Sequence, residues 1–331
     1  MLAALVLSCA AAACSTNGDP VVERSSAIGV SYCCGSEAFT LLIDAEHHNV
    51  DSEADPPRGI LFDSNRDGTV ELYEIRADGT ERRLTRSREG EFSRTPAWSP
   101  NGSRIVFQSG TRRTGPLALF VIDADGTGQR LLVGGEENFF SPDWSPTGDL
   151  IAFRVDRGDS TVRVDAVAPD GSGRRELIAE PAWSPAWSPD GEEIAYVASG
   201  DGTWNLFLIA RDGSRRRQLT HFVGEAGAGG PAWSPDGLRI AFNSDEDGNS
   251  NIYVIDADGT DLHRLTSSPA MEAGPSWSCD GQWIAFHSDR DSSFEGEEMS
   301  RGFEIYLMRP DGSDVRRLTN NTATDAHPDA C

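Results

Sequence analysis

The chain has 331 residues, with 29 basic and 53 acidic side chains and a formal net charge of −24. Every basic residue is arginine, because the sequence contains no lysine. This balance excludes a nucleic-acid-binding protein with a basic face, and it equally excludes docking on anionic lipid through a polybasic patch. A hydrophobic fraction of 38% is typical of a folded, soluble protein.

The first residues have the character of an export signal. Residues 1–13 form an apolar run that is too short to span a bilayer as a helix and has the small-residue ending of a secretory signal. Cys14 follows a run of alanines and precedes a polar stretch, which resembles a bacterial lipobox. We therefore expect a signal peptide over 1–14, lipidation at Cys14 and a periplasmic or outer-membrane location. Lipidation at Cys9, or a cleaved signal peptide without an anchor, remains open.

Internal repetition dominates the remainder of the chain. The phrase Pro-x-Trp-Ser-Pro-x-Gly begins at Pro96, Pro142, Pro185 and Pro231, and again at Pro275, where Cys279 replaces the second proline. The starts lie 43 to 46 residues apart. Periods of this length, with a tryptophan signature and many turn pairs, indicate the blades of a β-propeller.

Each repeat predicts four short antiparallel strands. In the copy that begins at Pro231 we expect strands around 231–234, over 239–244 and 251–255, and ending at 265–266, separated by Asp-Gly pairs. Asp-Gly is favoured in two-residue hairpins of type I′, in which both central residues have positive φ. The Asp-Gly pair between the third and fourth strands occurs six times, which predicts six blades: Asp78-Gly79, Asp125-Gly126, Asp170-Gly171, Asp212-Gly213, Asp258-Gly259 and Asp311-Gly312.

The first blade lacks its innermost strand. It starts near Gly59 without a Pro-x-Trp-Ser phrase, and a truncated phrase stands at the other end of the sequence, over 327–331. We therefore expect an all-β, six-bladed propeller of four-stranded antiparallel blades over 58–331, closed by the C-terminal strand, which leaves no free inner edge. Residues 15–57 are expected to form an N-terminal linker segment.

The repeats resemble those of a known family. The Trp-Ser-Pro-Asp-Gly segments, the Ile-Ala-Phe strands and the Ile-Tyr-Val-Ile-Asp-Ala-Asp-Gly phrase followed by Arg-Leu-Thr resemble the WD40-like repeats of the TolB family of bacterial propellers. The resemblance implies a non-catalytic scaffold in the cell envelope that binds a protein or a small ligand. TolB also has an α/β domain before its propeller, for which residues 15–57 are too few. The same repeats are similar to those of oligogalacturonate lyases, so the alternative is a polysaccharide lyase or hydrolase that uses residues at the channel mouth.

Candidate ligand-binding residues are those that precede each innermost strand and should line the channel. They are Arg94, Phe140, Glu180, Gly229, Glu272 and His327. A bound ligand should contact Arg94, Glu272 and His327. The sequence has no nucleophile elbow, no nucleotide-binding loop and no zinc-type cysteine spacing, so we predict no catalytic residue, no metal and no cofactor. The five repeat tryptophans are expected to pack between blades, and the protein is expected to be a monomer.

Two further features stand out along the sequence. Cys33, Cys34, Cys279 and Cys331 would meet an oxidising compartment after export, and four cysteines allow three pairings. We expect at least one disulfide to fasten an end of the chain to the ring. The segment 181–187 carries the Pro-Ala-Trp phrase twice in succession, which the repeat pattern does not explain.

Overall fold

The computed structural model describes residues 29–34, 37–42, 59–111, 115–159, 161–200, 202–224, 226–292 and 302–331. The chain divides into two units, Met1–Ala54 and Asp55–Cys331. In the first unit β1 (Gly29–Cys34) pairs antiparallel with β2 (Glu37–Leu42). Cys14 lies outside the described residues, and Cys33 and Cys34 fall on β1. Among the described residues, no helix is long and apolar enough to cross a membrane.

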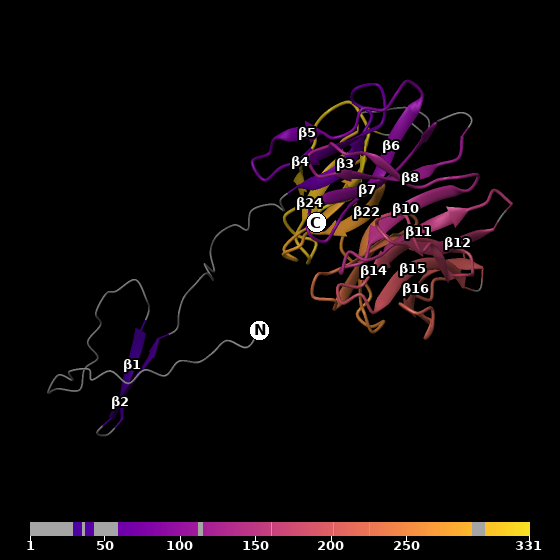
Figure 1. Ribbon diagram of the computed structural model, residues 1–331. Coiled ribbons are helices and arrows are strands. Elements are labelled where there is room, and N and C mark those ends of the chain that lie inside the picture. Colours follow the sequence, from indigo (N-terminus) through magenta and orange to yellow (C-terminus); the bar gives the residue numbers. More distant parts are fainter. Residues whose placement is uncertain are drawn as a thin grey trace. The chain divides into compact units, whose positions relative to one another are not determined.

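The second unit consists of six four-stranded antiparallel sheets, as predicted (Figure 1). In each of blades 1 to 3, the strands are named here from the innermost to the outermost of the sheet. Blade 1 is β26 (Asp325–Asp329), β3 (Ile60–Ser64), β4 (Glu71–Ile75) and β5 (Glu81–Arg83). Blade 2 is β6 (Glu91–Trp98), β7 (Arg104–Thr111), β8 (Ala118–Asp123) and β9 (Arg130–Val133). Blade 3 is β10 (Asn138–Trp144), β11 (Ile151–Asp156), β12 (Val162–Val167) and β13 (Arg175–Ile178).

Blades 4 to 6 repeat the arrangement. Blade 4 is β14 (Ala182–Trp187), β15 (Glu193–Gly200), β16 (Thr203–Ala210) and β17 (Arg217–Gln218). Blade 5 is β18 (Ala228–Trp233), β19 (Arg239–Ser244), β20 (Asn251–Asp256) and β21 (His263–Arg264). Blade 6 is β22 (Glu272–Trp277), β23 (Ile284–Ser288), β24 (Glu304–Met308) and β25 (Arg316–Arg317).

The ring closes through the C-terminal strand. β26 pairs antiparallel with β3, with Asp325 opposite Ser64 and Asp329 opposite Leu61. Blade 1 is therefore built from both ends of the propeller, which confirms the closure predicted from the truncated phrase at 327–331. The last strand fills the one innermost position that the repeats leave vacant.

The Asp-Gly turns differ from the expected type I′ geometry. In blade 1 the Gly79 amide donates to the Arg76 carbonyl at 2.9 Å, and only Gly79 of the Asp-Gly pair has a positive φ, 75°. The Asp78 carboxylate instead accepts the Thr80 amide at 2.9 Å. The type I′ prediction was wrong because the Asp-Gly pair occupies the last two positions of a four-residue turn that ends in a left-handed glycine.

Each innermost strand contains a β-bulge that the repeat pattern did not predict. The residue before the first proline of the phrase adopts a left-handed conformation in all six blades. These residues are Thr95, Ser141, Ser184, Gly230, Gly274 and His327, with φ from 45° to 60°. The register shifts at the same place in every blade. Non-glycine residues rarely adopt this conformation, so the surrounding ring must stabilise it.

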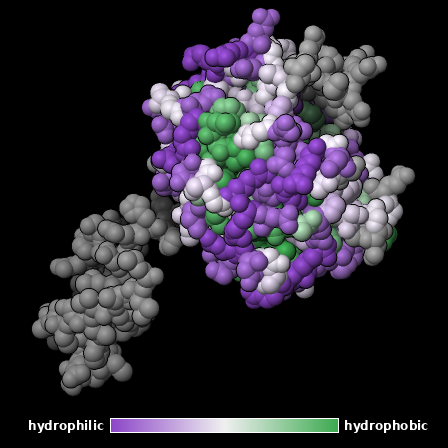
Figure 2. All heavy atoms as spheres, turned by 45° about the vertical axis from the view of Figure 1, so that its right-hand side comes forward, coloured by the Kyte–Doolittle hydropathy of each residue, from purple (hydrophilic) through white to green (hydrophobic). Residues whose placement is uncertain are grey.

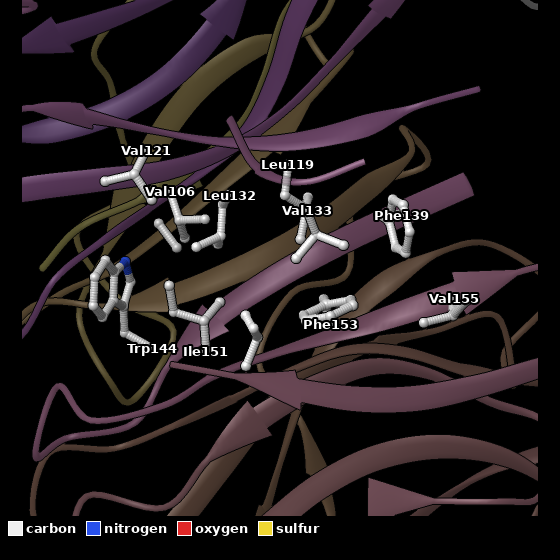
Figure 3. Close-up of a cluster of buried hydrophobic side chains, with 12 residues drawn as sticks. Val106, Leu119, Val121, Leu132, Val133, Phe139, Trp144, Ile151, Phe153 and Val155 are labelled. Carbon is white, nitrogen blue, oxygen red and sulfur yellow. The ribbon is translucent and has the colours of Figure 1, made fainter. Parts of the chain in front are cut away.

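The core consists of layers between neighbouring blades. Side chains of β7 and β8 face those of β11, and Val106, Val121 and Phe153 are fully or almost fully buried between them (Figure 3). The repeat tryptophans belong to these layers. Trp144, Trp187 and Trp277 are buried, whereas the Trp98 and Trp233 indoles donate to carbonyls of the preceding blade. The face of the propeller in Figure 2 is mainly hydrophilic, with smaller hydrophobic areas.

The threonine that ends the fourth strand's Arg-Leu-Thr phrase, which reads Gln-Leu-Thr in blade 4, ties the outermost strand to its neighbour. The buried Thr220 hydroxyl accepts the Leu206 amide and donates to Asn205, both at 2.9 Å. Thr220→Val should lower the free energy of unfolding by about 1–3 kcal/mol, because a buried amide loses its acceptor. Urea denaturation would measure the change. Thr260→Val, in an exposed turn, is the control, and an equal loss in both variants would contradict this assignment.

Candidate functional site

The innermost strands of all six blades line one cavity of about 520 Å³. Its wall runs from the left-handed bulge residue of each strand to the second proline of the phrase. The wall therefore repeats proline and tryptophan rings around the ring axis, with several serines, two aspartates and one histidine between them. In blade 6 the second proline is replaced by Cys279, which a disulfide joins to Cys331, with Cα atoms 5.1 Å apart.

The residue between proline and tryptophan connects neighbouring blades. Asp329 accepts the backbone amide of Trp98 at 2.7 Å, and Asp143 accepts that of Trp187 at 2.7 Å. Ser276 accepts the amide of Ala330 at 3.1 Å. In the other three blades this position is alanine, so the amides of Trp144, Trp233 and Trp277 have no acceptor there from the preceding blade. The Trp144 amide interacts instead with the Asp143 carboxylate beside it.

Two carboxyl groups of this wall have altered acidity. Burial raises the pKa of Asp143 to about 7, although hydrogen bonds from backbone amides favour its charged form. Burial also raises the pKa of Asp329 to about 6, and the negative charge of Asp329 contributes to the shift at Asp143. Near neutral pH the cavity therefore carries less negative charge than its composition indicates.

Of the three predicted ligand contacts, the structure places His327 and Arg94 near each other. His327 is the bulge residue of β26 and its Nδ1 lies 2.7 Å from Oδ1 of Asp63. Arg94 is exposed, and its charge acts on His327. The pair thus lies on neighbouring blades 1 and 2, close to the cavity wall that includes His327.

Glu272 does not belong to this group, and its predicted place at the channel mouth was wrong. Its side chain is fully buried in blade 6 and accepts a hydrogen bond from Arg290. The residue equivalent to Arg94 in blade 6 is Ala273, because both directly precede the left-handed residue of the bulge. A shift of one residue along a strand moves a side chain to the opposite face.

Two residues near His327 were missed by sequence reasoning. Asp63 lies opposite Ala326 on the neighbouring strand, and His287 lies opposite Ala273. Both are therefore next to small residues of the innermost strands. The His287 and His327 rings lie 5.5 Å apart. Burial, together with the charge of His327, lowers the pKa of His287 to about 3. Asp63 and His327 are 264 residues apart in the sequence, so local patterns could not join them.

The Asp63–His327 pair should make stability depend on pH. Burial disfavours the His327 cation, but the Asp63 charge and hydrogen bond outweigh it and raise the pKa above 6.5. The pair therefore stabilises the fold fully below about pH 6.5, and this contribution is lost as the pH rises through the folded-state pKa. His327→Gln should lower the free energy of unfolding by about 0.5–1 kcal/mol more near pH 6 than near pH 9. The difference is small because solvent screens the ion pair.

Urea unfolding of both proteins across this pH range would measure the difference. His221→Gln, which removes an exposed histidine outside the pair, is the matched control. An equal loss at both pH values for His327→Gln would show that the ion pair does not contribute.

The described part of the chain contains no group of three or more histidine, cysteine or acidic side chains arranged to hold a metal ion. The geometry is thus that of a closed six-bladed propeller with a lined axial cavity. The chain belongs to the TolB β-propeller domain family, whose model matches residues 109–226 and 170–328.

Several relatives carry the same repeats. A TolB homolog from Chlorobium luteolum is 32% identical over 153 residues, which are 45% of this chain and 34% of that protein. A Tol-Pal system protein TolB from Gluconobacter oxydans is 32% identical over 120 residues, which are 34% of this chain and 26% of that protein. The chain thus matches about a third or less of the length of these two curated relatives.

Solved structures show the same fold. The crystal structure of TolB from Acinetobacter baumannii has a TM-score of 0.69 and 18% identity, and the match covers 83% of this chain and 67% of that one. An oligogalacturonate lyase from Vibrio parahaemolyticus has a TM-score of 0.54 and 14% identity, covering 80% of this chain and 74% of that one. At these identities the likeness concerns the fold alone.

Proposed function

We propose that the chain is an exported, lipid-anchored propeller that acts as a non-catalytic scaffold in the cell envelope and binds a partner protein in its axial cavity. The observation that carries this proposal is the cavity itself, whose wall is contributed by all six blades. Relatives named as proteins of the Tol-Pal system support an extracytoplasmic location and an envelope partner.

The chemistry of the wall suits an extended segment of a partner. Proline and tryptophan rings offer apolar contact, and such concave sites with few polar groups are typical of binding sites. The amides of Trp233 and Trp277 share the register of the amides that Asp143, Asp329 and Ser276 bind. They are therefore placed to donate to carbonyl groups of a bound peptide.

Site-specific cross-linking tests the cavity as the partner's binding site. A photoreactive amino acid at Pro189, on the cavity wall, should cross-link one discrete envelope protein in intact cells. The same probe at Leu131, which is exposed on β9 of blade 2, should not. Ala232→Trp fills the cavity and should abolish the cross-link at Pro189. Equal cross-linking from both positions, or its persistence in Ala232→Trp, would refute binding in the cavity.

The membrane anchor is tested separately. Cys14→Ser should move the full chain from the membrane fraction to the soluble extracytoplasmic fraction, because a lipidated cysteine is the proposed attachment. Cys9→Ser is the matched control and should leave the protein on the membrane. Retention of Cys14→Ser on the membrane would contradict lipidation at this residue.

A further inference from the structure

Two of the eight tryptophans, Trp183 and Trp204, neither belong to the pattern of one tryptophan per repeat nor lie fully buried between blades. Five belong to the repeat phrase, and Trp283 is fully buried in the layer between blades 6 and 1. Trp183 comes from the doubled phrase at 181–187 and is only partly buried, and Trp204 on β16 is 42% exposed. Their rings meet edge to face with centroids 4.3 Å apart.

The position of Trp183 in the bulge explains why it is only partly buried. It directly precedes the left-handed Ser184, so it is the blade 4 equivalent of a position occupied in the other blades by Arg94, Phe140, Gly229, Ala273 and Ala326. Only the neighbouring blade 3 also has an aromatic residue there. The second tryptophan of the doubled phrase, Trp187, provides the packing between blades, which leaves Trp183 free for another role.

An arginine joins these aromatic residues into a continuous row. The Arg154 guanidinium lies 4.5 Å from the centre of the Phe140 ring and 5.7 Å from that of Trp183. Arg154 also donates to Asp156 at 3.1 Å, and the two side chains are 22% and 26% exposed. We call Phe140, Arg154, Trp183 and Trp204 the aromatic row.

The aromatic row is held in place before any ligand arrives. Trp183 packs against the core between blades 4 and 5. The backbone of Gly227 approaches Trp204 so closely that a Cβ there would lie 3.3 Å from the Trp204 Cβ. The Gly158 amide fixes Asp156 at 2.8 Å. A preorganised surface loses little conformational entropy on binding, which increases the affinity available from few contacts.

The chemistry of the row matches one class of ligand. Indole faces are electron-rich and attract the C–H groups of an apolar ring face. The adjacent Arg154–Asp156 pair offers a donor and an acceptor, which matches hydroxyl groups that both accept and donate hydrogen bonds. A neutral pyranose combines one C–H face with a rim of hydroxyl groups. We propose that the aromatic row is a binding site for a neutral saccharide, separate from the cavity proposed for the protein partner.

Titration with defined neutral oligosaccharides tests the proposal. Cellotriose, maltotriose and chitotriose would be added to the full chain, and binding followed by calorimetry and by tryptophan fluorescence. At least one should bind, and Trp204→Ala should weaken that binding about tenfold, with Trp204→Phe retaining most of it. Leu238→Ala is the control for removal of an exposed apolar side chain and should leave the affinity unchanged.

Three outcomes would overturn the proposal: no binding of any of the three sugars, unchanged binding to Trp204→Ala, or Trp204-dependent binding of a polyproline peptide in place of the sugars. Thermal unfolding of each variant would identify any loss of folding. The cross-link at Pro189 separates the two sites, because Trp204→Ala should weaken saccharide binding about tenfold without affecting partner capture in the cavity.

Discussion

Deleting residues 325–331 should remove several kcal/mol of the about 5–15 kcal/mol by which domains of this kind are stable, far more than loss of an ordinary tail. The deletion takes away β26, so β3 loses its partner and becomes an unpaired inner edge. It also removes the buried Asp325, whose carboxylate pairs with Arg66 at 2.8 Å, and the Asp329 acceptor of the Trp98 amide. Thermal unfolding and near-ultraviolet circular dichroism would measure the loss.

The control for this deletion is Cys331→Ser, which breaks the disulfide and keeps the strand. If the deletion proved no more harmful than Cys331→Ser, pairing of β26 with β3 would not be what stabilises the ring. A synthetic peptide with the sequence of the deleted strand should restore part of the lost stability, because it can pair with the unpaired edge of β3.

Breaking the disulfide should give the second-largest effect. Cys279 lies in the turn after β22 of blade 6, and Cys331 follows β26 of blade 1, so the bond joins the two blades on either side of the closure. A sequence separation of 52 residues corresponds to about 4 kcal/mol of stabilisation in the chain-entropy description, as an upper value. The double variant Cys279→Ser/Cys331→Ser should show this loss in urea unfolding under oxidising conditions.

A reducing agent provides the matched comparison. It should lower the stability of the wild-type chain toward that of the double variant and should not change the double variant itself. An unchanged unfolding midpoint in the double variant would show that the bond does not constrain the unfolded chain.

The overall architecture was predictable because it is local and repeated. Each Asp-Gly pair marks one hairpin, and six copies gave the number of blades, while the truncated phrase at 327–331 indicated how the ring closes. The bulge was not predictable, because nothing in Ser184 or Thr95 signals positive φ, and residues before proline usually avoid it. That bulge decides which side chains face the channel.

The candidate site was predicted less well for the same reason. Glu272 lies one residue before the position in blade 6 that corresponds to Arg94 in blade 2, and its side chain is buried. Asp63 and His287 reach His327 only through pairing of strands that are distant in sequence. Sequence left three disulfide pairings open, and the structure joins Cys279 to Cys331. The participation of Cys33 and Cys34 in a disulfide and the lipidation of Cys14 remain predictions.

The closure of blade 1 has a consequence for the order of folding. Blades 2 to 6 each form from one continuous stretch of chain, but blade 1 requires contacts such as Arg66 to Asp325, which are 259 residues apart. Closing so long a loop has a high entropic cost and is slow unless other structure already brings the ends together. We expect blades 2 to 6 to provide that structure. In pulse-labelled hydrogen exchange during refolding, β3 should gain protection after β7, β11 and β19, so that the first strand of the propeller is among the last to become native.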